Sequence, residues 1–447
     1  MGKLFGTDGV RGVAGKELTT DLAYKLGMAG TYALKKEQST PVIIIGKDTR
    51  VSGDMLEAAL AKGIIEAGGN VITVGVIPTP AVAYLTKYYN AASGIVISAS
   101  HNPYEYNGIK FFNSEGYKLA DEIEDSIEEL IFSGVDLRSK TIGTFEDRSD
   151  EADGIYVDFL VGTADYRLDG KKIVLDCANG ASYKVAEMTY KKLGADLVML
   201  ANEPSGENIN LNCGSTHPEN LAATVLKEKA FMGLAFDGDA DRLIAVDDKG
   251  RVVDGDKTIA IMAEMLKKED RLNYNRATVT VMSNLGFHKA MEKLGVKVDV
   301  TTVGDRYVLE SMLKTGSVIG GEQSGHIIFK NFATTGDGIL SSIQLIRASL
   351  KAGKPLSEMA DAIEIFPQVL VNAKIANKDK LTYREDPDVA KAITDCEVKM
   401  AGNGRVLIRP SGTEPLVRVM LEGKDIDEIT KYAKDLAALI EKKFPLE

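Results

Sequence analysis

The amino-acid sequence predicts an α/β protein of four domains around a central cleft. Three similar α/β domains with mixed, largely parallel sheets are followed by a smaller C-terminal α+β domain. At 447 residues the chain is too long for one compact core, because domains usually hold about 100–150 residues. Short β-branched apolar runs alternate with helical stretches three times along the chain. The chemistry-bearing motifs fall one to each domain, as expected if each domain lines one wall of a shared cleft.

The first domain, residues 1–152, alternates helix and strand. Thr20 is a suitable N-cap for a helix that begins at Asp21, and Pro78 and Pro80 open a later helix because proline is favoured in a first helical turn. Strands separated by helices of this length predict βαβ units and a parallel-rich sheet. The other expected elements are strands at 42–45, 71–74 and 95–97 and a helix at 55–67 that ends at two glycines.

The same alternation returns in the second domain, residues 153–253, and in the third, residues 254–366. The acidic stretches near 146–153 and 247–254 are the expected junctions between these domains. The expected elements are strands at KIVLDC, DLVML, GLAF, TVTVM and KVDVTTV and helices at 181–193 and 219–229.

The last domain, residues 367–447, breaks this alternation. RVLIR and LVRVMLEG form a strand pair around a Pro-Ser-Gly turn, and a closing amphipathic helix covers 426–442. Two strands and a helix in this order predict the smaller α+β domain.

Composition limits the classes of partner. The formal net charge is −11 with no basic block, which argues against nucleic-acid binding. Cys177, Cys213 and Cys396 are widely spaced, so neither a disulfide framework nor a structural zinc site is expected. The N-terminal segment lacks the apolar region of a signal peptide, and no apolar run approaches the roughly 20 residues of a membrane span. We therefore expect a cytoplasmic protein that binds neither nucleic acid nor membrane.

The first motif is GIVISASHNPYEYNGIK, from Gly94 to Lys110. An apolar strand ends here in a loop of serines, a histidine, an asparagine and a proline, at the place where active sites of open α/β sheets lie. A serine hydroxyl beside a candidate base predicts covalent catalysis. The alternative is a strand-to-turn connection whose polar side chains satisfy their own backbone. Spacing alone does not separate Ser98 from Ser100 as the nucleophile.

The second motif is DGDADR, directly after an apolar strand. Asp237, Asp239 and Asp241 stand at alternate positions, so their carboxylates can face one concavity and offer the hard oxygen ligands that suit Mg²⁺ or Ca²⁺. Without an ion, the three charges would repel one another. An EF-hand is disfavoured because its glycine and glutamate positions hold Arg242 and Asp248. A haloacid-dehalogenase-type site is disfavoured because Asp241 replaces its Thr or Val, and a solvated turn is the remaining alternative.

Two further motifs predict ligand contacts. GGEQSGH, residues 320–326, combines glycines that permit close approach with polar side chains suited to a polyhydroxyl or amino sugar, although a Gly-rich β-turn is the alternative. RPSGTEP begins at Arg409, and Arg418 lies in the next strand. Hydroxyls, a nest of backbone N–H groups and two arginines predict an anion pocket, with a plain hairpin turn as the alternative.

Three polar segments outside these motifs present arginines. FGTDGVRG presents Arg11, and the loops KDTR and GDRY, each after a strand, present Arg50 and Arg306. A nucleophilic serine, a metal site, a sugar-type loop and an anion pocket together predict phosphoryl transfer on a phosphorylated sugar.

The motifs FGTDGVRG, SASHNP, DGDADR, GEQSGH and RPSGTEP, in this order, make the chain resemble the α-D-phosphohexomutase superfamily over essentially its whole length. The resemblance implies that Ser100, and not Ser98, is the phosphorylated serine. It implies one Mg²⁺ ion held by Asp237, Asp239, Asp241 and a phosphate oxygen on Ser100.

The resemblance also assigns the remaining roles. The implied cations that offset the negative charge are Arg11, Lys110 and Arg242, the general acid and base are Lys110 and His326, the sugar contacts are Glu322 and Ser324, and the contacts to the phosphate that does not react are Arg409, Ser411, Gly412, Thr413 and Arg418. These assignments leave His101, the base candidate beside Ser100, without a proton-transfer role.

The activity implied by the resemblance is the interconversion of glucosamine 6-phosphate and glucosamine 1-phosphate, for UDP-N-acetylglucosamine and cell-wall precursor synthesis. Phosphoserine 100 would pass its phosphoryl group to the sugar, giving glucosamine 1,6-bisphosphate as intermediate and activator. The expected partner is a phosphorylated amino sugar, and a homodimer is an oligomeric state that the sequence leaves open. The rival functions are a mutase of mannose or glucose phosphates, a Mg²⁺-dependent sugar-phosphate phosphatase with Asp237 as nucleophile, and a Ca²⁺-binding module.

Overall fold

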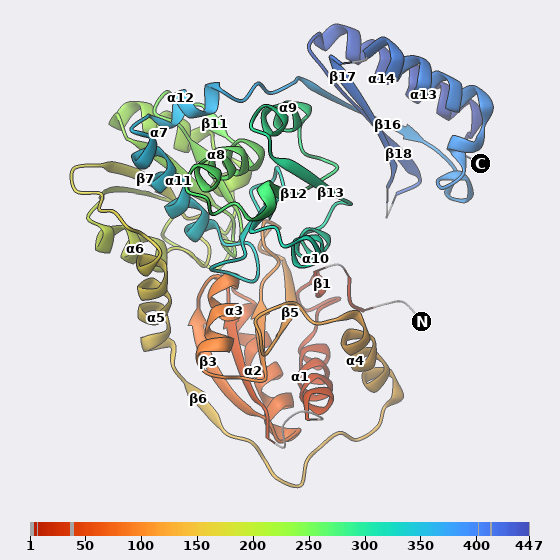
Figure 1. The fold of residues 1–447 in the computed structure, drawn as a ribbon. Coiled ribbons are helices and arrows are strands. Elements are labelled where there is room, and N and C mark those ends of the chain that lie inside the picture. Colours follow the sequence, from red (N-terminus) through yellow and green to blue (C-terminus); the bar gives the residue numbers. More distant parts are fainter. Residues whose placement is uncertain (1–3, 7, 36–39, 401, 412–413, 447) are drawn as a thin grey trace. The chain divides into compact units, whose positions relative to one another are not determined.

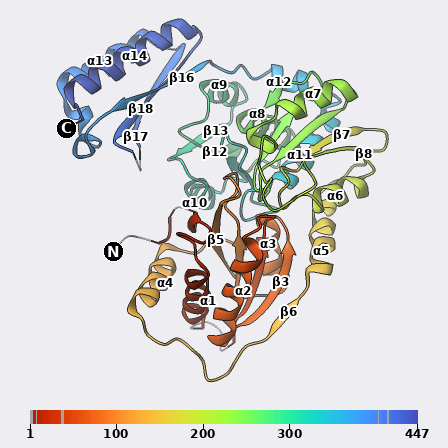
Figure 2. The same cartoon turned by 180° about the vertical axis from the view of Figure 1, so that it is seen from behind.

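The computed structural model describes residues 4–6, 8–35, 40–400, 402–411 and 414–446, which Figures 1 and 2 show from opposite sides. The chain forms two compact units, one of residues 1–282 and 294–362 and the other of residues 283–293 and 363–447. Three mixed sheets with parallel strands lie in the first unit, and an antiparallel sheet lies in the second. The predicted fold class of mixed α/β sheets followed by a smaller C-terminal domain is confirmed.

The first sheet is built by the N-terminal part of the chain. Its strands are β1 (Val10–Val13), β2 (Val42–Lys47), β3 (Asn70–Val76), β4 (Ser93–Ile97), β5 (Tyr106–Asn113) and β6 (Phe145–Asp147), and its helices are α1 (Thr20–Leu34), α2 (Gly53–Glu66), α3 (Thr79–Tyr88) and α4 (Asp121–Ser133). The strand order is β1-β5-β4-β2-β3-β6, with parallel pairing from β4 to β6 and antiparallel pairing at β1 and β5.

Helices cover both faces of the first sheet (Figures 1 and 2). Apolar side chains of β2 and β4 pack in one core with α1, α2 and α4. Helix α3 packs on the opposite face and comes closest at Gly94. A Cβ built on Gly94 would lie 2.1 Å from the hydroxyl of Thr86, which belongs to α3. The cap of α1 differs from our prediction by one residue, because the hydroxyl of Thr19 and not Thr20 accepts the hydrogen bond from the N–H of Leu22.

The second sheet follows a long helix, α5 (Ser149–Gly162). Its elements are β7 (Lys172–Asp176), α6 (Val185–Leu193), β8 (Asp196–Leu200), α7 (Glu219–Glu228), β9 (Met232–Phe236), β10 (Leu243–Val246) and β11 (Val252–Val253). The order is β11-β10-β9-β7-β8, with parallel pairing of β7 to its two neighbours. Helix α6 begins at Val185 and not at Ala181 as predicted, because the N–H of Ala181 donates to the carbonyl of Gly238.

The third sheet has the order β13-β12-β14-β15. Its elements are α8 (Gly255–Lys268), β12 (Arg276–Thr280), β13 (Lys297–Thr301), α10 (Asp305–Thr315), β14 (Ile319–Gly321), β15 (Ile327–Phe329), α11 (Gly338–Ala352) and α12 (Leu356–Asp361). The hairpin β14–β15 is antiparallel, and the other pairs are parallel.

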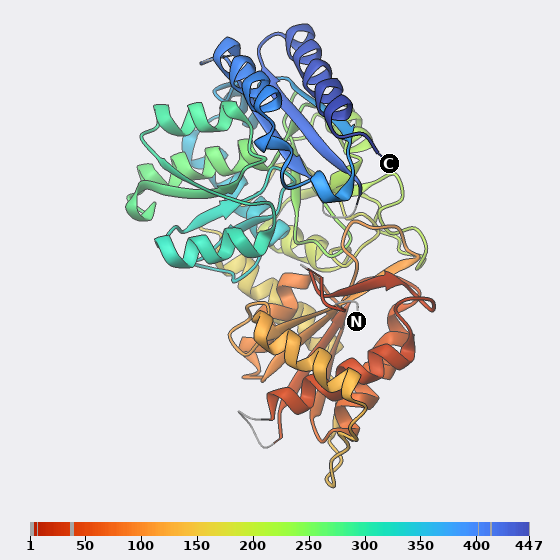
Figure 3. The same cartoon turned by 90° about the vertical axis from the view of Figure 1, so that its right-hand side faces the viewer.

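The second unit contains a sheet of order β16-β18-β17, antiparallel throughout. Its elements are α9 (Leu285–Lys293), β16 (Gln368–Lys374), α13 (Pro387–Met400), β17 (Gly404–Pro410), β18 (Leu416–Gly423) and α14 (Ile426–Lys443). Figure 3 shows α13 and α14 side by side over this sheet. The carboxylate of Glu422 ties α9 to the sheet by accepting from the N–H of Leu285 at 2.9 Å and from Nε of Arg405 at 3.0 Å.

Among the residues that the structure describes, no helix combines the length and the apolar character needed to cross a membrane.

Candidate active site

Ser100 lies in the loop that joins the buried strand β4 to β5. Its backbone has a φ of 54°, in the left-handed region, and its N–H donates to the hydroxyl of Ser98 at 2.9 Å. Its own hydroxyl is buried and donates to Oδ2 of Asp237 at 2.6 Å. The hydroxyl of Ser98 instead donates to Asp48 at 2.6 Å. The two serines that spacing left equivalent therefore face different partners, and Ser100 is the one that contacts the aspartate motif.

The three aspartates of the motif lie in the loop between β9 and β10. One carboxylate oxygen from each of Asp237, Asp239 and Asp241 lies within 4.8 Å of the others, and all three side chains are buried. Oδ1 of Asp239 and Oδ1 of Asp241 have no hydrogen-bond partner among the described residues. Buried, unpartnered and hard oxygen donors are the set that a divalent cation such as Mg²⁺ requires, so these residues fit the predicted metal.

The pKa shifts of these aspartates also favour a bound cation. Burial, with the charges of Asp241 and Asp239, raises the pKa of Asp237 well above its ordinary value. Burial also tends to raise the pKa of Asp239, but the charge of Lys110 and a hydrogen bond from Thr79 outweigh it and lower that pKa. Three carboxylates cannot all stay ionised at low cost without a cation between them.

Lys110, on β5, is the cation closest to this cluster. Its Nζ lies 3.0 Å from Oδ2 of Asp239 and 3.1 Å from Oδ2 of Asp8. Burial lowers the pKa of Lys110, but these two carboxylates outweigh burial and raise the pKa above its ordinary value. Lys110 is therefore protonated at neutral pH, a state that suits a proton donor and a counter-charge better than a base.

The two arginines predicted as cations border the same cluster. Arg11, on β1, forms an ion pair with Asp8. Nε of Arg242 lies 3.8 Å from Oδ1 of Asp241 and 4.0 Å from Oδ2 of Asp237. Neither Nε atom has a hydrogen-bond partner among the described residues, so both arginines retain donors for an anion.

The predicted sugar loop forms the turn of the hairpin β14–β15. The Gly-rich β-turn that we gave as the alternative for this motif is therefore present. The hairpin meets the aspartate loop through a β-bridge between His326 and Arg242. Oε1 of Glu322 accepts from the N–H of Gly304 at 3.1 Å, and Ser324 is exposed.

His326 is buried beside the aspartates. Nε2 of His326 lies 3.6 Å from Oδ2 of Asp305 and 3.9 Å from Oδ2 of Asp241, and neither ring nitrogen has a hydrogen-bond partner among the described residues. A Cβ at Gly336 would lie 2.4 Å from the ring, so this glycine is what allows the ring its place. His101 lies at the edge of the cluster, with Nδ1 3.4 Å from the hydroxyl of Ser100. Burial, with Arg242 and Arg11, lowers the pKa of His101 to about 4 and keeps it neutral.

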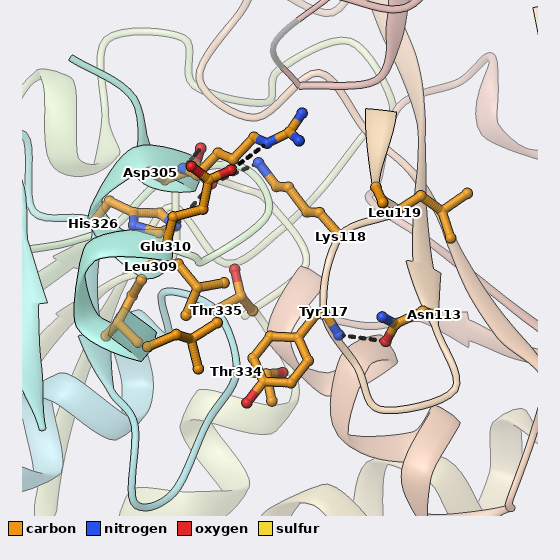
Figure 4. Close-up of a pocket in the computed structure, with 14 residues that line it drawn as sticks. Asn113, Tyr117, Lys118, Leu119, Asp305, Leu309, Glu310, His326, Thr334 and Thr335 are labelled. Carbon is orange, nitrogen blue, oxygen red and sulfur yellow. Dashed lines mark hydrogen bonds and ion pairs between the residues drawn. The ribbon is translucent and has the colours of Figure 1, made fainter. Parts of the chain in front are cut away.

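A series of ion pairs, Lys110–Asp8–Lys118–Asp305, connects Lys110 beside the aspartate cluster with Asp305 beside His326, and it was not predicted from the sequence. Nζ of Lys118 lies 2.6 Å from Oδ1 of Asp8 and 2.6 Å from Oδ2 of Asp305. Figure 4 shows Lys118 pointing toward Asp305, with His326 next to Asp305, and all three line a cavity of about 220 Å³. Asp8 and Asp305 lie inside the motifs FGTDGVRG and GDRY, but only their neighbours Arg11 and Arg306 were singled out. No local pattern marked Lys118.

The predicted phosphate loop belongs to the second unit and joins β17 to β18. Arg409 and Arg418 are directly opposite each other in this antiparallel pair, so two like charges share one face of the sheet. Burial and the charge of Arg418 lower the pKa of Arg409. Ser411 is buried, and its hydroxyl accepts from the N–H of Glu414 at 3.2 Å. Gly412 and Thr413 lie outside the described residues.

A buried serine beside a carboxylate triad, on a chain of successive α/β sheets, is the arrangement expected of metal-assisted group-transfer enzymes. Residues 2–137, 155–250, 254–366 and 370–439 match, in this order, the α/β/α domains I, II and III and the C-terminal domain of phosphoglucomutase/phosphomannomutase. The chain belongs to the phosphoglucomutase/phosphomannomutase family.

The chain is similar to other members of this family over almost its full length. It is 55% identical to the phosphoglucosamine mutase of Thermoanaerobacter sp. (strain X514), an alignment that covers 99% of this chain and 100% of that protein. The fold matches a phosphoglucomutase/phosphomannomutase family protein from Burkholderia thailandensis, with a TM-score of 0.82, 24% identity and coverage of 99% and 97% of the two chains. It also matches N-acetylphosphoglucosamine mutase of Aspergillus fumigatus in complex with GlcNAc-6P and magnesium, with a TM-score of 0.70, 17% identity and coverage of 98% and 95%. The chain is thus an enzyme of the isomerase class.

Proposed function

We propose that the enzyme interconverts glucosamine 6-phosphate and glucosamine 1-phosphate through a phosphoserine at Ser100. The observation that carries this proposal is the 2.6 Å hydrogen bond from the hydroxyl of Ser100 to Asp237, a member of the buried carboxylate triad. The 55% identity to a phosphoglucosamine mutase over the whole chain supports an amino-sugar substrate. The product would feed UDP-N-acetylglucosamine and cell-wall precursor synthesis, in the cytoplasm.

The proposed metal is one Mg²⁺ ion held by Asp237, Asp239, Asp241 and a phosphate oxygen on Ser100. When bound, Mg²⁺ would neutralise charge on the phosphoryl group that is transferred. The carboxylate oxygens of Asp239 and Asp241 that lack partners support this assignment.

The proposed reaction has two balanced half-reactions. In the first, the 6- or 1-hydroxyl of the sugar phosphate attacks the phosphorus of phosphoserine 100, the bond from phosphorus to Oγ breaks, and glucosamine 1,6-bisphosphate forms. The proton of the attacking hydroxyl passes to His326, whose ring nitrogens accept no hydrogen bond among the described residues, and protonated Lys110 gives a proton to the departing Oγ. In the second half-reaction Oγ of Ser100 gives its proton back to Lys110 and attacks the phosphorus of the other phosphate. The bond from that phosphorus to the sugar oxygen breaks, and His326 returns its proton to this oxygen.

The remaining residues orient the substrate in this proposal. Arg11 and Arg242 have Nε donors without a hydrogen-bond partner among the described residues, and these would stabilise the transferring phosphoryl group. Glu322 and Ser324 would bind the sugar. The contacts to the phosphate that does not react would be Arg409, Ser411, Gly412, Thr413 and Arg418. An anion between Arg409 and Arg418 would offset the repulsion of two opposed guanidinium groups.

The boundaries 1–152, 153–253, 254–366 and 367–447 describe the four domains in this proposal. A homodimer is the oligomeric state to test beside the monomer, by light scattering of the purified chain.

A coupled assay tests the proposed function. The purified enzyme, primed with glucosamine 1,6-bisphosphate and Mg²⁺, is given glucosamine 6-phosphate, glucose 6-phosphate or mannose 6-phosphate, and the 1-phosphate is measured. We expect kcat/KM to be highest for glucosamine 6-phosphate. A higher kcat/KM for the glucose or mannose phosphate would make the enzyme a phosphoglucomutase or phosphomannomutase, and release of inorganic phosphate without a 1-phosphate would make it a phosphatase.

A further inference from the structure

Arg50 does not point out of its loop as the sequence predicted, because its guanidinium is completely buried. Nε of Arg50 donates to Asp48 at 2.9 Å. The two terminal nitrogens donate to backbone carbonyls of the loop that carries Ser100. Their acceptors are the carbonyls of Ser100 at 2.9 Å, Asn102 at 2.8 Å, Tyr106 at 2.9 Å and Pro103. One side chain thus binds four carbonyls within seven residues of chain.

Asn210 binds two of these carbonyls from another part of the sequence. It lies in the segment between β8 and α7, and its Nδ2 donates to the carbonyl of Ser100 at 2.9 Å and to that of Asn102 at 3.1 Å. Each of these two carbonyls therefore accepts from both Arg50 and Asn210. An oxygen with two lone pairs is fully satisfied by two such donors.

The aspartate loop closes over this arrangement. A Cβ at Gly238 would lie 2.5 Å from the carbonyl oxygen of Ser100 and 2.8 Å from Nδ2 of Asn210. Only glycine permits the backbone of the aspartate loop to approach the carbonyl of Ser100 and the side chain of Asn210 so closely. The carbonyl of Ser100 and its hydroxyl are thus both fixed by contacts, the carbonyl to Arg50 and Asn210 and the hydroxyl to Asp237.

These contacts hold Ser100 in a backbone conformation that side-chain-bearing residues rarely adopt, with a φ of 54°. The N–H of Ser100 is held by the hydroxyl of Ser98 and its carbonyl by Arg50 and Asn210, and these two anchors fix the φ angle of Ser100. The φ angle determines where Cβ and Oγ point relative to the preceding chain, so if the carbonyl were released, relaxation toward an ordinary negative φ would move Oγ away from Asp237.

We propose that Arg50 and Asn210 are positioning residues that lock the Ser100 loop so that Oγ faces the carboxylate triad. The inference rests on the proposed function, since it assigns these residues to the phosphoryl-transfer step of that reaction. Neither residue touches the substrate in this proposal. Both act through the backbone of Ser100.

Domain packing does not depend on Asn210 alone. The hydroxyl of Thr49 donates to the carbonyl of Asn179 at 2.6 Å, and the N–H of Val51 donates to the carbonyl of Gly206 at 2.9 Å. These two bonds join the loop after β2 to the second α/β part of the chain without using Asn210, so we expect an Asn210 variant to fold with its domains packed as in the wild type.

The chain offers a matched control in Asn212. Asn210 and Asn212 both have left-handed φ values, of 59° and 53°, so replacing either by alanine imposes a similar backbone penalty. Asn212 is exposed, and its side chain forms no hydrogen bond within the described part of the chain. A difference between N210A and N212A therefore reports on the two carbonyl contacts.

The experiment compares wild type, N210A, N210D and N212A, each primed with glucosamine 1,6-bisphosphate. We measure kcat, the KM for glucosamine 6-phosphate, the melting temperature, the fraction of phosphorylated Ser100 by mass spectrometry, and the ³¹P chemical shift of the phosphoserine. N210D keeps the shape and the tolerance of a left-handed φ but replaces the donor by an acceptor. We expect N210A and N210D to lower kcat about tenfold or more with little change in KM, because small displacements of a reacting atom are costly.

If Asn210 served only to stabilise the fold, the ³¹P chemical shift of the phosphoserine would not change in its variants. It should shift in N210A and N210D and stay at the wild-type position in N212A, with kcat of N212A also unchanged. Wild-type kcat and ³¹P shift in both Asn210 variants would overturn the positioning role. An equal loss of kcat in N212A would also overturn it. A wild-type enzyme with no mutase turnover and no phosphate on Ser100 would instead overturn the proposed function itself.

Discussion

Oγ of Ser100 donates a 2.6 Å hydrogen bond to Oδ2 of Asp237, across a sequence separation of 137 residues. The strand ends that bear these two residues belong to different sheets, β4 in the first and β9 in the second. The contact places a nucleophile-type hydroxyl against one of three buried carboxylates. A phosphate on Ser100, as proposed above, would therefore lie beside the carboxylates proposed as Mg²⁺ ligands.

Replacing Ser100 by alanine tests this arrangement most directly. S100A removes the proposed phosphate acceptor, so mutase turnover should fall by at least about a thousandfold, as when other covalent nucleophiles are removed. The matched control is S98A, which removes the hydroxyl that accepts from the N–H of Ser100 but leaves Oγ of Ser100 in place. Phosphopeptide mapping should find the phosphate at Ser100 in S98A and in wild type. Phosphate on Ser98 in S100A would contradict the assignment.

Removal of the metal should abolish activity and lower stability together. Chelation leaves three buried carboxylates that repel one another, and Mg²⁺ that binds only the folded state stabilises it by about 2.7 kcal/mol at roughly a hundred times its Kd. We expect EDTA to eliminate turnover, Mg²⁺ to restore turnover and melting temperature, and Ca²⁺ to restore activity poorly because it prefers more ligands at longer distances.

The variant D241N provides the control for the metal experiment. Loss of one ligand charge should weaken Mg²⁺ binding, measured by titration calorimetry, and should shrink the shift in melting temperature that Mg²⁺ causes. Full turnover after exhaustive chelation would argue against a metal at Asp237, Asp239 and Asp241.

The sequence predicted best those elements whose pattern is local. The strands β8 and β18 begin and end where the apolar runs DLVML and LVRVMLEG do, and the motif DGDADR alone places three carboxylates together. The start of α6 could not be predicted this way. The segment before Val185 has helix-compatible residues, but Ala178 and Asn179 adopt left-handed φ values, and the N–H groups of Asn179 and Ala181 donate to the carbonyls of Ala201 and Gly238 in other loops.

The contacts of Lys118 and Arg50 could not be predicted from the sequence, because they depend on packing between distant segments of chain. Lys118 is separated from Asp8 by 110 residues and from Asp305 by 187, and no periodicity links them. Arg50 was expected to be presented to a ligand because arginine follows a strand end, whereas four loop carbonyls and Asp48 surround its guanidinium. The central cleft between four domains, inferred from the distribution of motifs, stays a prediction.

Lys118 should contribute to stability as well as to the site. Its Nζ lies 2.6 Å from each of two carboxylates, those of Asp8 and Asp305, so K118M would leave both without this counter-charge. Breaking such a largely buried pair costs about 3 kcal/mol, which urea unfolding at neutral pH would measure. The control is K25M, which removes an exposed pair with Asp21 four residues away and should cost less than about 0.5 kcal/mol. Equal midpoints for K118M and K25M would contradict this contribution.

Asp337 should make the stability of the protein fall as pH rises from about 4 to about 6. Burial raises the pKa of Asp337 from 3.8 to about 6, against the effect of the hydrogen bonds it accepts from Tyr156 at 2.6 Å and from the N–H of Leu340 at 2.9 Å. The folded state therefore binds a proton more tightly than the unfolded state. The resulting stabilisation is complete below the unfolded pKa and is lost as pH rises through the folded pKa.

The variant D337N isolates this effect from the other titrating groups. Its amide can still accept from Leu340 and can donate to the hydroxyl of Tyr156, but it does not titrate. The difference in unfolding free energy between wild type and D337N should change by about 2.4 kcal/mol between pH 4 and pH 7, with wild type relatively more stable at pH 4. Urea unfolding of both proteins across this range measures the difference. Parallel curves would show that Asp337 has the same pKa in the folded and unfolded states.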